Sequence, residues 1–206
     1  MSKCCINEQR RKKKMSVTQP IRNTEQLKLL KSYYLSEKRN PRDYMLIILG
    51  LNTALRISDI LRLTYGDVYD YQRKEWKTHI VIIEQKTGKQ NRIYMNREVK
   101  TVFRNYTDPS SCTPSTWIFT SQKQKKGHLS RYQAYRIVKA AGAFAGLNES
   151  ISCHSLRKTF GYHAWKQGTA PALLMSIFNH SAYQITKRYL CIEQDDKDEV
   201  FAKIKI

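Results

Sequence analysis

The sequence predicts a mainly helical α+β domain that contains one small antiparallel β-sheet. Segments with helical spacing of apolar residues recur from residue 24 to residue 191, whereas only two neighbouring runs are rich in β-branched residues. No long polar linker divides the chain, and its 206 residues with 41% hydrophobic content are enough to bury one sizeable core. We therefore expect one domain over residues 18–206, preceded by an arm over residues 1–17.

Capping residues and apolar spacing predict the first two helices. Thr24 is expected to cap an amphipathic helix whose apolar positions continue to Leu35. Pro41 suits the first turn of a second helix, which runs to about Leu51. This second segment is apolar on every side, so it is predicted to be a buried core helix.

A helix junction and a hairpin come next along the chain. Ser58 is a candidate cap, which places Arg56 between two helices. The β-branched runs at residues 79–84 and 91–95 flank a turn that contains glycine, and this arrangement predicts a hairpin with lysines at its tip. The segment Trp117-Ile-Phe-Thr is expected to supply a third strand to the same sheet.

The other apolar segments predict short helices. One covers residues 98–106, and Ser130 is expected to cap a longer helix that ends near Phe144. Three more helices are predicted towards the C-terminus, at residues 155–167, 171–178 and 183–191.

The charge balance points to a polyanionic partner. Lysine and arginine number 37 against 17 acidic residues, which gives a net charge of +20. The first 14 residues carry a net charge of +5 with little apolar content, and this predicts a flexible basic arm. No segment approaches the length of a membrane span, and five cysteines without disulfide or zinc-finger spacing favour reduced thiols in a cytoplasmic protein.

The candidate chemical residues are two arginines, a lysine at the hairpin, two histidines and a tyrosine: Arg56, Lys86, His154, Arg157, His180 and Tyr189. Around them the sequence lacks the carboxylates and Cys/His clusters that metal sites and hydrolytic triads need, so neither a metal nor another cofactor is expected. Two arginine forks instead suit the oxygens of a phosphate diester. Taken singly, each residue also has an ordinary structural interpretation, such as a surface ion pair or a packed core histidine.

The order and spacing of these residues resemble those of the tyrosine recombinase, or phage integrase, family over about residues 24–192. The matching boxes are Thr53-Ala-Leu-Arg-Ile-Ser-Asp, Glu84-Gln-Lys-Thr-Gly-Lys, His154-Ser-Leu-Arg, Phe178-Asn-His-Ser and Thr186-Lys-Arg-Tyr. The resemblance implies that Tyr189 is the nucleophile, and chemistry makes His154 the candidate base. Lys86 is the expected proton donor to the 5' oxygen, with Lys89 as its substitute.

The departures from the family pattern are mild. Ala54 and Asn179 stand where glycine is common, Phe178 where leucine is common, and Lys158 where a second histidine is common, so no reacting group is lost. Many relatives carry a separate DNA-binding domain before the catalytic one, whereas about 23 residues precede it here. In this respect the chain resembles the short fimbrial-switch invertases, whose Leu-Ser-Arg-x-Gln-Ala-Tyr-Arg-Ile stretch is similar to residues 129–137.

The resemblance implies a site-specific DNA recombinase that works through a covalent 3'-phosphotyrosine intermediate in integration, excision or inversion. Two alternatives remain open: a type IB topoisomerase-like enzyme that relaxes DNA, and a non-catalytic DNA-binding regulator with the same fold. A basic RNA-binding module is a weaker interpretation, because the sequence lacks the aromatic strand motif of such modules. The expected partners are double-stranded DNA, further copies of the chain on paired DNA sites, and accessory DNA-bending proteins.

The segment 193–206 begins with acidic residues and ends with apolar positions at Val200, Phe201 and Ile204, which predict one stripe of a short helix. Such a stripe needs a surface to cover it. It either packs on its own domain or, as the resemblance implies, docks on the neighbouring protomer.

Overall fold

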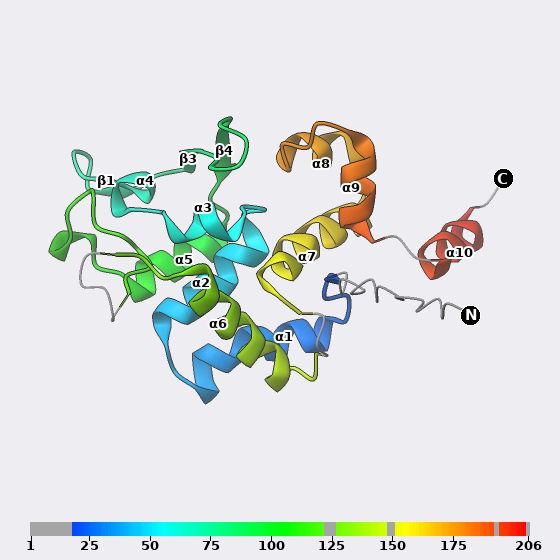
Figure 1. Ribbon diagram of the computed structural model, residues 1–206, viewed down its shortest axis with the longest axis horizontal. Coiled ribbons are helices and arrows are strands. Elements are labelled where there is room, and N and C mark those ends of the chain that lie inside the picture. Colours follow the sequence, from blue (N-terminus) through cyan, green and yellow to red (C-terminus); the bar gives the residue numbers. More distant parts are fainter. Residues whose placement is uncertain (1–17, 122–126, 148–150, 192–193, 205–206) are drawn as a thin grey trace, which may run out of the picture.

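The computed structural model describes residues 18–121, 127–147, 151–191 and 194–204, and within them the protein is mainly helical (Figure 1). The α-helices are α1 (Thr24–Ser32), α2 (Pro41–Asn52), α3 (Ile57–Leu61), α4 (Tyr65–Val68), α5 (Arg97–Tyr106), α6 (Arg131–Phe144), α7 (Cys153–Lys166), α8 (Pro171–Ile177), α9 (Tyr183–Leu190) and α10 (Gln194–Lys203). A π-helical turn, η1 (Tyr33–Glu37), extends α1, and η2 (Pro109–Ser111) is a 3-10 turn. The predicted fold class is confirmed, whereas the predicted basic arm at residues 1–17 lies outside the described residues.

The strands form two separate antiparallel pairs. Strand β1 (Tyr69–Asp70) pairs with β2 (Glu75–Trp76), and β3 (His79–Ile83) pairs with β4 (Gln90–Tyr94). The β3–β4 pair is the predicted hairpin, in register from His79 opposite Tyr94 to Ile83 opposite Gln90. Gly88 turns the chain with φ at 65°, a value that suits glycine, and the hairpin tip carries Lys86.

Helix α2 forms the centre of the core. Its side chains from Met45 to Leu51 are buried, as its apolar sequence predicts, and the helix packs against α5, α6 and α7. Gly50 permits the close approach of α7, because a Cβ atom there would lie 2.5 Å from Cδ1 of Leu156. The glycine therefore allows the helix that carries His154 and Arg157 to lie directly on the core.

A second, smaller core lies beneath α8 and α9. It contains the buried residues Ala54, Leu174, Phe178 and Leu190. Gly161 of α7 leaves room for the Phe178 ring, which would lie 2.6 Å from a Cβ at that position. This core joins α7 to the α8–α9 turn, which carries His180, and to α9, which carries Tyr189.

Two predicted helix caps are wrong. Asn23, not Thr24, caps α1, and its side chain accepts hydrogen bonds from the backbone of Glu25 and Gln26. Ser58 lies inside α3, whose N-cap is Arg56 itself, so the junction at Arg56 is confirmed but the cap is not.

The expected third strand at Trp117–Thr120 is also wrong. Within the described residues this segment makes only two isolated bridges, between Thr64 and Trp117 and between Thr120 and His128. Helix α4 begins immediately after Thr64, so the neighbouring chain leaves the extended conformation before a ladder can grow. The segment therefore joins neither sheet. None of the described helices is both long and apolar enough to cross a membrane.

Candidate active site

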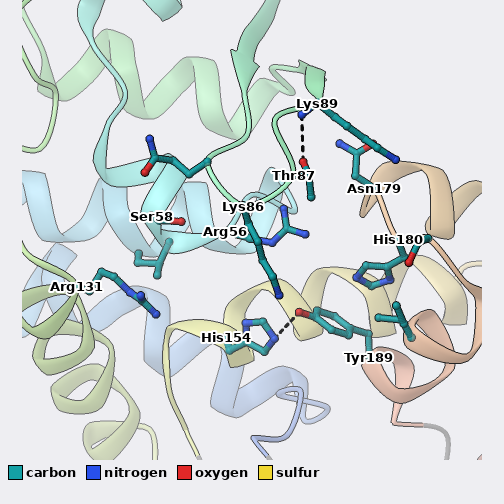
Figure 2. A pocket seen from close by; sticks show the side chains of 14 residues that line it. Arg56, Ser58, Lys86, Thr87, Lys89, Arg131, His154, Asn179, His180 and Tyr189 are labelled. Carbon is teal, nitrogen blue, oxygen red and sulfur yellow. Dashed lines mark hydrogen bonds between the residues drawn. The ribbon is translucent and has the colours of Figure 1, made fainter.

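A cleft of about 700 Å³ lies between the β3–β4 hairpin with α3 on one side and α7 with the α8–α9 turn on the other (Figure 2). Five of the six predicted site residues line it: Arg56, Lys86, His154, His180 and Tyr189. The sixth, Arg157, is only 1% exposed and lies beneath the cleft rather than in its wall. The fold thus brings together residues from the start of α3, the β3–β4 turn, α7, the α8–α9 turn and α9.

Tyr189 and His154 form a hydrogen-bonded pair at the floor of the cleft. The Tyr189 hydroxyl is bonded to Nε2 of His154, and the ring centroids lie 4.9 Å apart (Figure 2). Partial desolvation, followed by the positive charges of Arg157, Lys158, Arg56 and Lys86, lowers the pKa of His154 to about 4. At neutral pH this imidazole is therefore uncharged and able to accept a proton.

Arg157 is a buried cation that joins three segments. Its Nη1 donates to the carbonyl of Ala54 and its Nη2 donates to the carbonyl of Phe178 at 2.8 Å. Its guanidinium carbon lies 4.8 Å from the centroid of the Phe178 ring and 5.8 Å from that of Tyr189. Burial, and then the charge of Arg56, lowers the pKa of Arg157 to about 10, so the side chain stays protonated at neutral pH.

His180 lies on the opposite side of the tyrosine from His154. Its Nδ1 is 3.0 Å from Oγ1 of the buried Thr186, its ring stacks on Phe178, and its centroid is 4.6 Å from that of Tyr189. Burial and the nearby charges of Arg157 and Arg56 lower the pKa of His180 to about 4. The tyrosine ring is therefore held between two neutral imidazoles.

Arg56 and Lys86 supply the positive charge of the opposite wall. Arg56 forms an ion pair with Glu84, whose side chain is fully buried. Lys86 extends from the hairpin towards the His154–Tyr189 pair, whereas Lys89 points towards Asn179 (Figure 2). Because the ammonium of Lys86 has no hydrogen-bond partner in the described part of the chain, it is available to a ligand.

The cleft also contains residues to which the sequence analysis gave no role. Glu84 binds Arg56, and Arg131 in the first turn of α6 lines the cleft. Asn179 lines it too, in the left-handed conformation with φ at 52°. The signal for Glu84 was an acid that ends a β-branched run just before the lysine turn, but only the folded hairpin shows which arginine it meets. Across the described ranges, no three His, Cys, Asp or Glu side chains gather as a metal site would require.

This fold, with a tyrosine hydroxyl bonded to a neutral imidazole among cations, defines a class of protein equipped to attack a phosphate ester. Comparison with known protein families gives the same class: the chain belongs to the phage integrase family, whose model matches residues 21–195.

Two curated relatives show the range of similarity. The chain is 41% identical over 181 residues to the probable integrase/recombinase YoeC of Bacillus subtilis (strain 168), covering 88% of this chain and 93% of that protein. It is 29% identical over 150 residues to the type 1 fimbriae regulatory protein FimE of Escherichia coli (strain K12), covering 72% and 73% of the two chains. The match to FimE confirms the resemblance to a fimbrial regulatory protein.

Solved structures show the same fold. The XerA recombinase superposes with a TM-score of 0.72 at 17% identity, covering 92% of this chain and 66% of that one. The XerH recombinase bound to palindromic difH substrate also gives a TM-score of 0.72, at 20% identity, with 89% of this chain and 52% of that one covered. The chain thus spans about half to two thirds of these longer recombinases.

Proposed function

We propose that this protein is a site-specific DNA recombinase that breaks and rejoins DNA through a covalent 3'-phosphotyrosine intermediate. The observation that carries the proposal is the hydrogen bond between the Tyr189 hydroxyl and the neutral His154 imidazole at the floor of a cationic cleft. An ordinary tyrosine, with a pKa of about 10, is protonated at neutral pH and needs such a base to attack phosphorus.

Each proposed step uses a side chain of this cleft. With its proton on Nδ1, His154 presents a free Nε2, which takes the proton of Tyr189 as the tyrosine oxygen bonds to phosphorus. The bond from phosphorus to the 5' oxygen breaks, and Lys86 donates a proton to that oxygen. The new phosphotyrosine ester keeps the reactivity of the broken bond, so the reverse steps rejoin a strand without another energy source.

The arginines act on the charge of the phosphate. Arg56 lines the cleft, while Arg157 lies directly beneath Tyr189 and Phe178. As phosphorus becomes five-coordinate, extra negative charge develops on its oxygens, and guanidinium groups held in place stabilise that charge. His180, fixed by Thr186, is positioned to donate or accept a further hydrogen bond at the same centre.

The proposed partner is double-stranded DNA in the cytoplasm, bound by several copies of the chain on paired sites together with accessory DNA-bending proteins. The net charge of +20 supports an interaction with phosphates. Among the solved structures with this fold, the Tn1549 transposon integrase is in complex with transposon right end DNA, and a lambda integrase dimer is bound to a COC' core site.

Covalent capture of a nicked suicide substrate tests the proposal. Wild-type protein should become linked to the DNA, whereas Tyr189→Phe should bind the same DNA and form no adduct, because it lacks only the nucleophilic oxygen. Tyr183→Phe is the matched control, since Tyr183 lies exposed at the start of the same helix and should leave capture unchanged. An adduct formed by Tyr189→Phe would refute the assignment. A wild-type protein that binds DNA but forms no adduct would favour a regulator.

A further inference from the structure

A fully buried carboxylate connects the two cations of the hairpin wall. Glu84 follows strand β3 and is 0% exposed. Its Oε2 accepts hydrogen bonds from Nη1 of Arg56 and, at 2.9 Å, from the hydroxyl of Thr87. Its Oε1 accepts one from the amide of Asn91 at 2.8 Å. One side chain therefore contacts the start of α3, the hairpin turn and strand β4.

The same residue also fixes the backbone of the turn that carries Lys86. The amide of Glu84 donates to the carbonyl of Lys89 at 2.9 Å, and the amide of Gly88 donates to the carbonyl of Glu84 at 2.8 Å. Together with the Thr87 hydroxyl, these bonds hold the turn on both sides of Lys86. The position of the lysine is thus set by contacts of Glu84 rather than by partners of its own ammonium.

The Glu84 carboxylate is ionised and faces cations. Burial raises its pKa, but hydrogen bonds from Asn91, Arg56 and Thr87, together with the nearby amide of Asn179, outweigh burial, so the pKa of Glu84 lies below its ordinary value. Asn179 contributes by proximity, since its amide nitrogen makes no hydrogen bond of normal geometry. The negative charge also acts on Arg157 and His180, so it offsets part of the repulsion among the clustered positive groups.

Arg56 keeps most of its binding capacity while paired. Glu84 is its one side-chain hydrogen-bond partner among the described residues, through Nη1, and the Arg56 side chain, 15% exposed, lines the cleft. Since a guanidinium has five N–H donors, the others remain free for phosphate oxygens. The ion pair therefore orients the fork without blocking it.

We propose that Glu84 is a positioning residue that fixes Arg56 and Lys86 relative to each other across the scissile phosphate. This inference rests on the proposed recombinase function. Through Arg56 it sets where the phosphate binds, and through Thr87 and the turn it sets where the proton donor stands. Phosphate binding and protonation of the leaving 5' oxygen are then coupled through one buried carboxylate.

Two substitutions distinguish the connection of Glu84 to Arg56 from its connection to the lysine turn. Thr87→Val keeps the volume of the side chain but removes the hydroxyl that donates to Glu84, so it loosens the lysine turn and leaves the Arg56 pair intact. Glu84→Gln keeps the shape but removes the charge, so it weakens both connections. Thr101→Val and Glu75→Gln are matched controls, because both residues are exposed and lie on α5 and β2, away from the cleft.

The test compares covalent capture of an ordinary suicide substrate with capture of one that carries a 5'-bridging phosphorothiolate, whose sulfur leaves without a proton donor. Thr87→Val should slow capture of the ordinary DNA about 5- to 10-fold, as for the loss of one hydrogen bond, and the sulfur substrate should restore the wild-type rate. Glu84→Gln should slow capture on the order of 100-fold, and the sulfur substrate should restore only part of the rate.

The outcomes distinguish this inference from the function on which it rests. If wild-type protein captures neither substrate, the recombinase proposal is overturned, and this inference with it. If wild-type protein captures both, but Thr87→Val and Glu84→Gln match the controls, Glu84 has no positioning role. Equal slowing of both variants on both substrates would also overturn the inference, because it would show a general structural defect, which thermal unfolding of the variants would confirm.

Discussion

Arg157→Lys should destabilise the folded protein as well as slow the reaction, because the arginine is part of the core. In the DNA-free structure it is 1% exposed and joins the carbonyl of Ala54 to that of Phe178. A lysine ammonium is a single nitrogen on a narrower stem and cannot place donors where both Nη atoms stand. One carbonyl should then remain buried without a partner.

The expected loss in the free energy of unfolding follows from these contacts. A buried carbonyl left unpaired costs about 1–3 kcal/mol. Loss of the guanidinium face, 4.8 Å from the Phe178 centroid, removes about 0.5–2 kcal/mol more. The middle of the combined range is about 3 kcal/mol, which lowers the melting temperature by roughly 6–12 °C in a chain of this length. In catalysis, loss of one charge-stabilising donor should slow covalent capture by about 10²–10³-fold.

Thermal unfolding by circular dichroism measures the first effect, and capture assays well below the melting temperature measure the second. Arg136→Lys is the matched control, since Arg136 is exposed on α6. Arg56→Lys should slow capture comparably but lower the melting temperature less, because Arg56 lies at the cleft surface. A melting temperature for Arg157→Lys within 2 °C of the wild-type value would refute the role of Arg157 in stabilising the core.

Two further predictions follow from the cleft. Lys86→Ala should lose covalent capture of ordinary DNA and regain it with a 5'-bridging phosphorothiolate, whose sulfur leaves without a proton donor. Arg157→Ala should not regain capture with that substrate. If the sulfur substrate restored capture only to a Lys89 variant, the proton donor would be Lys89. The pKa values of His154 and His180 lie near 4, below the ordinary 6.5, so between these pH values the folded protein binds fewer protons than the unfolded chain. Its melting temperature should therefore fall as the pH is lowered from about 6.5 to about 4, and a double His154→Gln/His180→Gln variant should show a flatter profile.

Local signals made most helices predictable. Pro41 after Asn40 marks the start of α2, and the Asn40 side chain accepts from the backbone of Asp43 as a cap should. Ser130 caps α6 in a reciprocal arrangement with Gln133, again from neighbouring residues. At α1, Asn23 and Thr24 are adjacent residues of good capping type, and the sequence alone does not decide which one bends out of the helix.

The features that the sequence did not predict depend on contacts between distant segments. Trp117 has a strand-like sequence, but whether it joins a sheet depends on a partner strand elsewhere, and its neighbour Thr64 immediately precedes a helix. The motifs predicted which side chains approach one another in the cleft. They did not predict that Arg157 would lie beneath it, because its acceptors belong to Ala54 and Phe178, which are 103 and 21 residues away.

The C-terminal helix α10 combines an anchored first turn with exposed apolar residues. Asp196 is 5% exposed and contacts Arg22 at 3.4 Å, Lys166 at 3.1 Å and the Tyr162 hydroxyl at 3.1 Å, all in the same chain. Phe201 and Ile204 are instead 77% and 57% exposed, while the side chain of Val200 lies outside the described residues. Polar contacts thus hold α10 to its own domain, while Phe201 on the helix and Ile204 just after its end remain available to another surface.

Deleting residues 195–206 should therefore spare cleavage at a single DNA site but weaken protomer association and strand exchange between two sites. Because the deletion also removes the contacts of Asp196 with Arg22, Lys166 and Tyr162, the double variant Phe201→Ser/Ile204→Ser is the cleaner test. Its melting temperature should match that of the wild type, since both residues are exposed. Leu29→Ser/Leu35→Ser replaces two exposed apolar residues on α1 and η1 and should leave assembly unchanged. If Phe201→Ser/Ile204→Ser assembles on paired sites as well as this control does, α10 serves its own domain alone and does not connect one protomer to the next.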